Sequence, residues 1–171
     1  KEAIIILTNI LEDTKQEPMV RHEAAEALGA IASQESIQVL ERYLNDSVTE
    51  VAETCELALE RIEWLSSKES SEELLSNPYN SVDPAPPLKN SNVQELKTIL
   101  LNDKASLFLR YRAMFTLRNM NADDAVLTLC EALNYGSALF KHEVAFVLGQ
   151  LQSDVSVPYL SNSLEDCLEN E

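Results

Sequence analysis

An internal repeat is the feature that most constrains how this chain folds. Residues 20–31 (VRHEAAEALGAI) align without a gap on residues 140–151 (FKHEVAFVLGQL), and His, Glu, Ala, Leu and Gly coincide. Weaker copies lie at residues 50–61 and 109–120, so that related segments recur about every thirty residues. A period of this length is typical of solenoids, in which each helical unit packs only on its neighbours.

Each unit has the pattern of an α-hairpin. Pro18 suits the first position of a helix, and Ser33 begins a break before a second apolar pattern. Between them the apolar residues follow a helical period and form one stripe: Ala24, Ala27, Leu28 and Ile31. The chain has only three glycines, too few for the many turns of a β-sandwich. These features predict an all-α fold of HEAT-type α-hairpin repeats that forms a superhelical solenoid.

Two glycines fall inside the predicted helices, at Gly29 and Gly149. Glycine in a helix interior costs about 1 kcal/mol relative to alanine. We therefore expect close approach of another backbone at both positions.

The repeat array is interrupted once. Residues 66–92 are rich in Ser, Pro and charge, and Pro84, Pro86 and Pro87 oppose helix formation. We predict two helical blocks, residues 1–65 and 93–171, joined by residues 66–92 as a linker.

Charge and composition exclude several classes of function. The chain carries 13 basic and 29 acidic residues, a formal net charge of −16, which repels a phosphate backbone and favours a basic partner or a cationic substrate. We therefore expect no binding to nucleic acid. Apolar runs such as residues 3–7 are far shorter than the roughly 18 residues of a transmembrane helix, so we expect no membrane association. Three cysteines without a C-x-x-C motif favour reduced thiols and a cytoplasmic location.

A second, longer repeat indicates a larger parent protein. Residues 7–13 (LTNILED) match residues 160–166 (LSNSLED) at an offset of 153 residues, and the chain begins at Lys1 without an initiator methionine. Shifting the His-Glu dipeptides by this offset places their copies just outside the chain. We expect a parent of two tandem halves, each with two His-Glu pairs, of which this chain is a central portion.

The chain has two histidines, and each is followed by glutamate: His22-Glu23 and His142-Glu143. One interpretation is structural, with each histidine making a partly buried hydrogen bond near a helix N-terminus. The other is a metal site. Neither pair has the second histidine of an H-E-x-x-H motif, so several stacked helices would have to converge on the metal. Nitrogen and oxygen ligands without thiolate suit Fe(II), Mn(II) or Zn(II).

A family resemblance is carried by five segments, which include part of the predicted linker: residues 18–31, 50–55, 81–87, 110–115 and 136–151. On these segments the sequence resembles the deoxyhypusine hydroxylase family, and the likeness runs along essentially its whole length. It implies a non-haem di-iron monooxygenase of hypusine biosynthesis, an oxidoreductase. Such an enzyme holds two Fe(II) ions per complete active site and uses O2 to hydroxylate the deoxyhypusine side chain of a translation factor.

The resemblance also implies roles for individual residues. Members of this family carry four His-Glu pairs, and this chain contains two of them. His22, Glu23 and His142 match iron ligands. Glu143 matches a carboxylate that either binds metal or holds the amines of the substrate. We expect no catalytic residues beyond these ligands.

Two alternatives to a metal-dependent enzyme follow from the same residues. One is a non-catalytic HEAT-repeat scaffold that binds a protein. The other is self-association, in which two copies of the chain supply four His-Glu pairs. A further group, Arg110, Arg112 and Arg118, suggests either a basic strip or, as we expect in this acidic chain, ion pairs.

Overall fold

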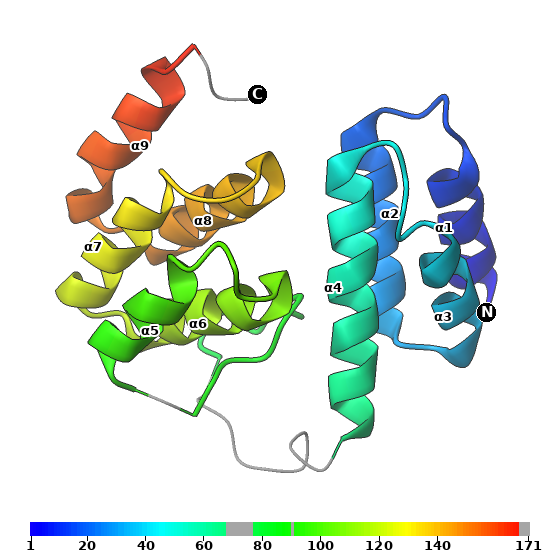
Figure 1. The fold of residues 1–171 in the computed structure, drawn as a ribbon, viewed down its shortest axis with the longest axis horizontal. Helices are drawn as coiled ribbons and strands as arrows, with labels where there is room; N and C mark the ends of the chain where they lie inside the picture. The colour runs from blue at the N-terminus through cyan, green and yellow to red at the C-terminus, as the bar shows by residue number, and fades with distance from the viewer. Residues whose placement is uncertain (68–76, 90, 168–171) are drawn as a thin grey trace. The chain divides into compact units, whose positions relative to one another are not determined.

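The computed structural model describes residues 1–67, 77–89 and 91–167, and the regular secondary structure of these segments is helical, as predicted (Figure 1). The described residues form two compact units. Unit 1 contains residues 1–67 and 82–84, and unit 2 contains the others. Within the described segments, no helix has both the length and the apolar character needed to cross a membrane.

Unit 1 consists, in chain order, of the helices α1 (Glu2–Glu12), α2 (Pro18–Ile31), α3 (Gln34–Arg42) and α4 (Thr49–Ser66). Pro18 occupies the first turn of α2, where its missing N–H costs nothing. Ala32 ends α2 in the left-handed conformation, and the hydroxyl of Ser33 then caps α3 by accepting a hydrogen bond from the N–H of Ser36. The predicted hairpin and its break are therefore confirmed.

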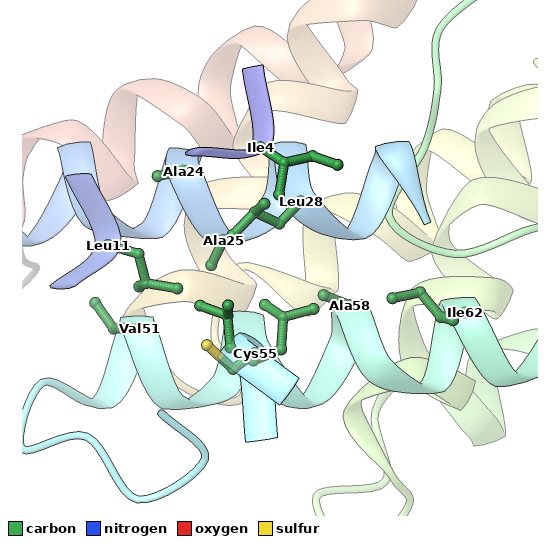
Figure 2. Packing of buried hydrophobic residues seen from close by; sticks show 11 residues of the cluster. Ile4, Leu11, Ala24, Ala25, Leu28, Val51, Cys55, Ala58 and Ile62 are labelled. Atoms are coloured by element: carbon green, nitrogen blue, oxygen red, sulfur yellow. The ribbon is translucent and has the colours of Figure 1, made fainter. Parts of the chain in front are cut away.

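The core of unit 1 lies where α2 packs against both α1 and α4 (Figure 2). Leu11, Leu28, Leu40 and Cys55, one from each helix, are fully buried. Burying a leucine side chain contributes about 1.5–3 kcal/mol. Burial also raises the pKa of the Cys55 thiol to about 12. Cys55 therefore acts as a small apolar side chain in this core.

The two helix glycines differ in their surroundings. A methyl group placed on Gly29 would lie 2.6 Å from the Cβ and 2.9 Å from the Cα of Ala58 in α4. The expected close approach is therefore confirmed at Gly29, where α2 and α4 touch backbone to backbone. The expectation was wrong for Gly149, where an added methyl group would meet no atom of the described residues within 4 Å. Gly149 lies on an exposed face of its helix, so packing does not require glycine there.

Alanine substitutions at the two glycines should have opposite effects on stability. Gly29→Ala should lower the free energy of unfolding by about 1–2 kcal/mol, because overpacking against Ala58 outweighs the gain in helix propensity. Gly149→Ala should raise it by about 0.5–1 kcal/mol, because only the propensity term applies. Urea unfolding of the two variants measures both changes. A stabilised Gly29→Ala variant would contradict the close helix contact.

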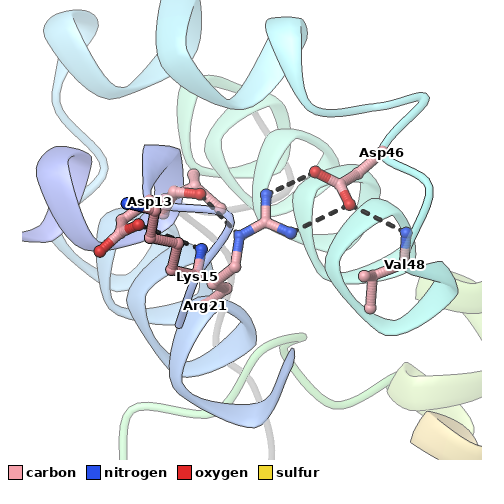
Figure 3. A network of polar contacts seen from close by, with 6 residues as sticks. Asp13, Lys15, Arg21, Asp46 and Val48 are labelled. Carbon is pink, nitrogen blue, oxygen red and sulfur yellow. Dashed lines mark hydrogen bonds and ion pairs between the residues drawn. The ribbon is translucent and has the colours of Figure 1, made fainter. Parts of the chain in front are cut away.

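A buried ion pair ties the end of α1 to the loop before α4 (Figure 3). The Nε of Arg21 donates to the carbonyl of Leu11 over 2.9 Å. Its Nη1 and Nη2 donate to the two carboxylate oxygens of Asp46 over 3.1 and 2.5 Å. The N–H of Val48 donates to the same carboxylate over 2.9 Å. The side chains of Arg21 and Asp46 are only 3% and 7% exposed, so the charge of each is compensated by the other and hardly by water.

Unit 2 contains the helices α5 (Val93–Leu100), α6 (Leu107–Met120), α7 (Asp123–Ala132), α8 (Ala138–Leu151) and α9 (Val157–Glu165), with the 3-10 helix η2 (Asp154–Ser156) before α9. Its architecture repeats that of unit 1. α2 and α6 begin 89 residues apart, as do α4 and α8. The Nε of Arg110 donates to the carbonyl of Leu100 over 2.9 Å, as Arg21 does to Leu11.

The three arginines of α6 are buried and have different partners. Arg110 forms an ion pair with Asp103 over 3.1 Å, as expected from the sequence. The Nε of Arg112 donates instead to the carbonyl of Pro86 over 3.2 Å. Arg118 is fully buried, with its guanidinium 4.8 Å from the ring centroids of both Tyr79 and Phe115. These side chains hold the fold together and do not form an exposed basic strip.

Apart from Ser66, the last residue of α4, the described part of the predicted linker is non-helical, and it is hydrogen-bonded to helices of each unit. In unit 1, Arg61 of α4 donates from Nε to the carbonyl of Asp83 over 3.1 Å. In unit 2, the N–H of Leu88 donates to the hydroxyl of Thr116 over 2.7 Å. The division into three segments stays a prediction, since residues 68–76 and 90 of the proposed linker lie outside the described residues.

Candidate functional site

The first His-Glu pair lies near the N-terminus of α2, on the face that packs against α4. His22 is the fifth residue of this helix and is 3% exposed. Its Nδ1 lies 2.8 Å from the hydroxyl oxygen of Thr54 in α4. The hydroxyl of Thr54 in turn donates to the carbonyl of Glu50 over 2.7 Å. The ring of His22 is thus held in one orientation by a neighbouring helix.

The carboxylate of Glu23 lies beside the other nitrogen of the same ring. Although adjacent residues on a helix project about 100° apart, Oε1 of Glu23 comes within 3.7 Å of Nε2 of His22. The Glu23 side chain is 68% exposed, so its oxygens are accessible from solvent. One imidazole nitrogen and one carboxylate therefore face the same region, which suits two ligands of a single metal ion.

The second pair lies at the matching position of α8, in unit 2. Ser137 caps this helix by accepting a hydrogen bond from the N–H of Phe140. His142 is exposed, whereas Glu143 is buried. The distribution is the reverse of that in α2, where the histidine is buried and the glutamate is exposed.

The structure places the two pairs in different units, and in unit 1 it brings Nε2 of His22 close to the carboxylate of Glu23. Among the described residues, no group of three or more histidine, cysteine, aspartate or glutamate side chains has the geometry to hold a metal ion. The assignment of His22, Glu23, His142 and Glu143 as ligands of one centre stays a prediction.

Glu26 is a titratable residue close to the first pair that the sequence analysis did not identify. It lies one turn after His22 on α2 and is half-buried. Burial, followed by the negative charges of Glu23 and Asp83, raises the pKa of its carboxyl to about 7, while Arg61 opposes the shift. The sequence shows that Glu26 follows His22 by four residues, about one helix turn. It does not show that Asp83 comes close to Glu26.

Thr54 was also missed. It lies 32 residues from His22, in a different helix. A threonine within an otherwise apolar helical stripe carries no signal that a histidine of another helix will reach it. Only the packing of α2 on α4 reveals the contact.

Comparison with known proteins gives the chain its family. The family described as "HEAT repeats" matches residues 1–60, and that described as "PBS lyase HEAT-like repeat" matches residues 109–135. Deoxyhypusine hydroxylase of Drosophila melanogaster is 56% identical over 99% of this chain, and that of Homo sapiens is 53% identical over 98%. A solved structure of the human enzyme in complex with glycerol matches with a TM-score of 0.93 at 53% identity and covers 99% of this chain.

This chain belongs to the deoxyhypusine hydroxylase family. The HEAT-type prediction and the family resemblance drawn from the sequence are both confirmed. The chain spans about 56% of the Drosophila relative, 55% of the human relative and 58% of the chain in the solved structure. It therefore corresponds to little more than half of the length of these relatives.

The raised pKa of Glu26 predicts a pH-dependent loss of stability within this family member. The folded-state pKa of Glu26 lies above the unfolded value near 4.5, so the fold favours the protonated carboxyl. This contribution to stability is complete below pH 4.5 and is lost as the pH rises through about 7. Glu26→Gln removes the ionising group. The free energy of unfolding of the Glu26→Gln variant, relative to that of the unmodified chain, should increase by about 1–3 kcal/mol between pH 5 and pH 8. Urea unfolding at each pH measures this change.

Glu23→Gln provides the comparison for this prediction. It removes the largest charge repulsion on Glu26 but leaves its burial unchanged. The pH dependence should therefore become smaller in Glu23→Gln without disappearing. Parallel stability curves for Glu26→Gln and the unmodified chain would contradict the assignment.

Proposed function

We propose that this chain contributes to a deoxyhypusine hydroxylase. In this reaction one oxygen atom of O2 enters the deoxyhypusine side chain of a translation factor, and the other leaves as water after an external reductant supplies two electrons. Family membership over 99% of the chain supports the reaction. The observation that carries the site is the placement of Nε2 of His22 beside the carboxylate of Glu23.

The donors that are present fit the iron that the family resemblance implies. His22 and Glu23 offer nitrogen and oxygen from one helix turn, and His142 offers an exposed imidazole in α8. No thiolate is needed: Cys55 and Cys130 are buried, and burial raises the pKa of both thiols. In the complete site, two Fe(II) ions would supply O2 activation, because no protein side chain oxidises an unactivated C–H bond.

Glu143 has a second possible role within the same proposal. The residue is 8% exposed, so water screens the charge of its carboxylate less than that of a surface residue. In the complete site this carboxylate would either bind metal or pair with an ammonium group of the substrate. The net charge of −16 favours the approach of such a cationic side chain from a distance.

The location and assembly of the protein belong to the same proposal. Three free cysteines, of which Cys167 is exposed, are in keeping with the reducing cytoplasm. Because the chain holds two of the four expected pairs, two copies could join in the presence of Fe(II). Light scattering with and without Fe(II) tests this association, and an unchanged monomer mass would contradict it.

Isotope incorporation tests the reaction itself. The protein is loaded with Fe(II) and incubated with a chemical reductant, a deoxyhypusine-containing substrate protein and heavy-oxygen-labelled O2. Mass spectrometry should show one labelled oxygen atom on the modified lysine side chain. An iron-loaded protein that leaves the substrate unlabelled would overturn the proposed function.

A further inference from the structure

The contact between Thr54 and His22 joins two helices through one hydroxyl group. Thr54 is 3% exposed, and its oxygen lies 2.8 Å from Nδ1 of His22 and 2.7 Å from the carbonyl oxygen of Glu50. Both distances are those of well-formed hydrogen bonds. The hydroxyl therefore has two partners, and their chemistry determines which of them receives its proton.

The carbonyl of Glu50 settles the direction of both hydrogen bonds. A carbonyl oxygen only accepts, and a threonine hydroxyl has a single proton. The proton of Thr54 must therefore point to Glu50, which leaves a lone pair of the hydroxyl oxygen directed at His22. Nδ1 of His22 must then carry a proton and donate it to Thr54. In the neutral ring this tautomer places the remaining lone pair on Nε2.

We infer that Thr54 is a positioning residue that fixes His22 in the Nδ1–H tautomer and directs the lone pair of Nε2 to the side of Glu23. The chemical requirement is general: a histidine that binds metal through one nitrogen donates its other N–H to a nearby acceptor, which sets the tautomer and the ring orientation. Here the acceptor is a hydroxyl whose own proton is held by the backbone of α4. The part of this inference that concerns metal rests on the proposed function.

Another threonine provides a matched control. Thr128 in α7 is 5% exposed, and its hydroxyl donates to the carbonyl of Asp124 over 2.8 Å. Its hydroxyl makes the same hydrogen bond to a carbonyl four residues earlier, in a buried helix position. Among the described residues, no histidine is hydrogen-bonded to Thr128. Thr128→Val and Thr54→Val therefore lose the same intrahelical bond, and only the latter loses the acceptor of His22.

Nitrogen NMR of the imidazole rings tests the tautomer without any metal. The chain has two histidines, so His142→Ala assigns the His22 signals by difference. At a pH where the ring is neutral, the unmodified chain and Thr128→Val should show His22 protonated at Nδ1. Thr54→Val should shift His22 toward the Nε2–H form, and Thr54→Ser should restore the Nδ1–H form. An Nε2–H ring in the unmodified chain, or an unchanged tautomer in Thr54→Val, would overturn the inference.

Titration with Co(II), as a redox-stable substitute for Fe(II), tests the consequence for metal. Loss of an outer partner of a ligating histidine typically weakens metal binding by about 10–100-fold. Thr54→Val should show this loss, whereas Thr54→Ser and Thr128→Val should bind like the unmodified chain. Absence of Co(II) binding to the unmodified chain would overturn the metal role of His22 in the proposed function, while the tautomer measurement would still decide the role of Thr54.

Discussion

Replacing His22 with alanine should abolish iron-dependent hydroxylation, with a loss of at least about 100-fold in turnover. The loss of an outer partner alone costs about 10–100-fold, and His22→Ala removes the ligand itself. His142→Ala should have an effect of the same order. Turnover is measured as oxygen incorporation into the substrate protein, and bound iron is measured by elemental analysis. A variant that keeps both its iron and its turnover would show that His22 is not a ligand.

His22 is buried, so His22→Ala could lower activity by weakening the fold. His22→Asn separates the two causes, because its amide N–H can still donate to the hydroxyl of Thr54 but no nitrogen replaces Nε2. We expect His22→Asn to unfold at nearly the temperature of the unmodified chain and still to lack iron and turnover. A non-catalytic scaffold would behave differently, since neither substitution would remove anything beyond local stability and partner binding would persist.

Replacing Arg21 with alanine should lower the free energy of unfolding by about 3–5 kcal/mol, the range for breaking a buried ion pair from one side. The substitution leaves the Asp46 carboxylate, 7% exposed, without its guanidinium partner, and it removes the donor to the carbonyl of Leu11. Urea unfolding measures the change. Arg42→Ala is the control: it breaks the Arg42–Glu12 pair, whose side chains are 59% and 35% exposed, and should cost at most about 1 kcal/mol. Equal losses would contradict the importance of burial.

The same pair should make the fold sensitive to acid. The hydrogen bond from Arg21 holds the pKa of the Asp46 carboxyl below its usual value. A lowered pKa means that the stabilisation is present above the unfolded value near 3.8 and is lost as the pH falls through the folded value. Asp46→Asn should be less stable than the unmodified chain at neutral pH, and this difference should shrink in acid. A difference that is constant with pH would contradict the assignment.

Several elements of this structure were predictable because they depend on local chain chemistry. Pro18 and Ser33 mark the start of α2 and the cap of α3, since an N–H that is missing or satisfied by a hydroxyl acts within one turn. The aligned VRHEAAEALGAI and FKHEVAFVLGQL segments both became helices that begin at the same position of the repeat, Pro18 and Ala138. Periodicity and caps therefore sufficed for helix identity and for the repeat.

The sequence also singled out the His-Glu pairs, because two identical dipeptides in one register stand out in any alignment. It could not say what surrounds them. His22 is buried and His142 is exposed although their local sequences match, since burial depends on which helix packs on each face. For the same reason Gly29 and Gly149 looked equivalent, yet only Gly29 meets the backbone of α4.

The sequence by itself thus determined the all-α repeat architecture, the family and the residues with the potential to bind metal, because each is written in local pattern and spacing. Only the tertiary structure decided the partners of those residues. Thr54 reaches His22 across 32 residues and Asp46 reaches Arg21 across 25, and both contacts exist because α2 packs beside α4 and the loop that precedes it. Hydrogen bonds need distances near 3 Å and defined angles, which chain periodicity does not specify and side-chain packing does.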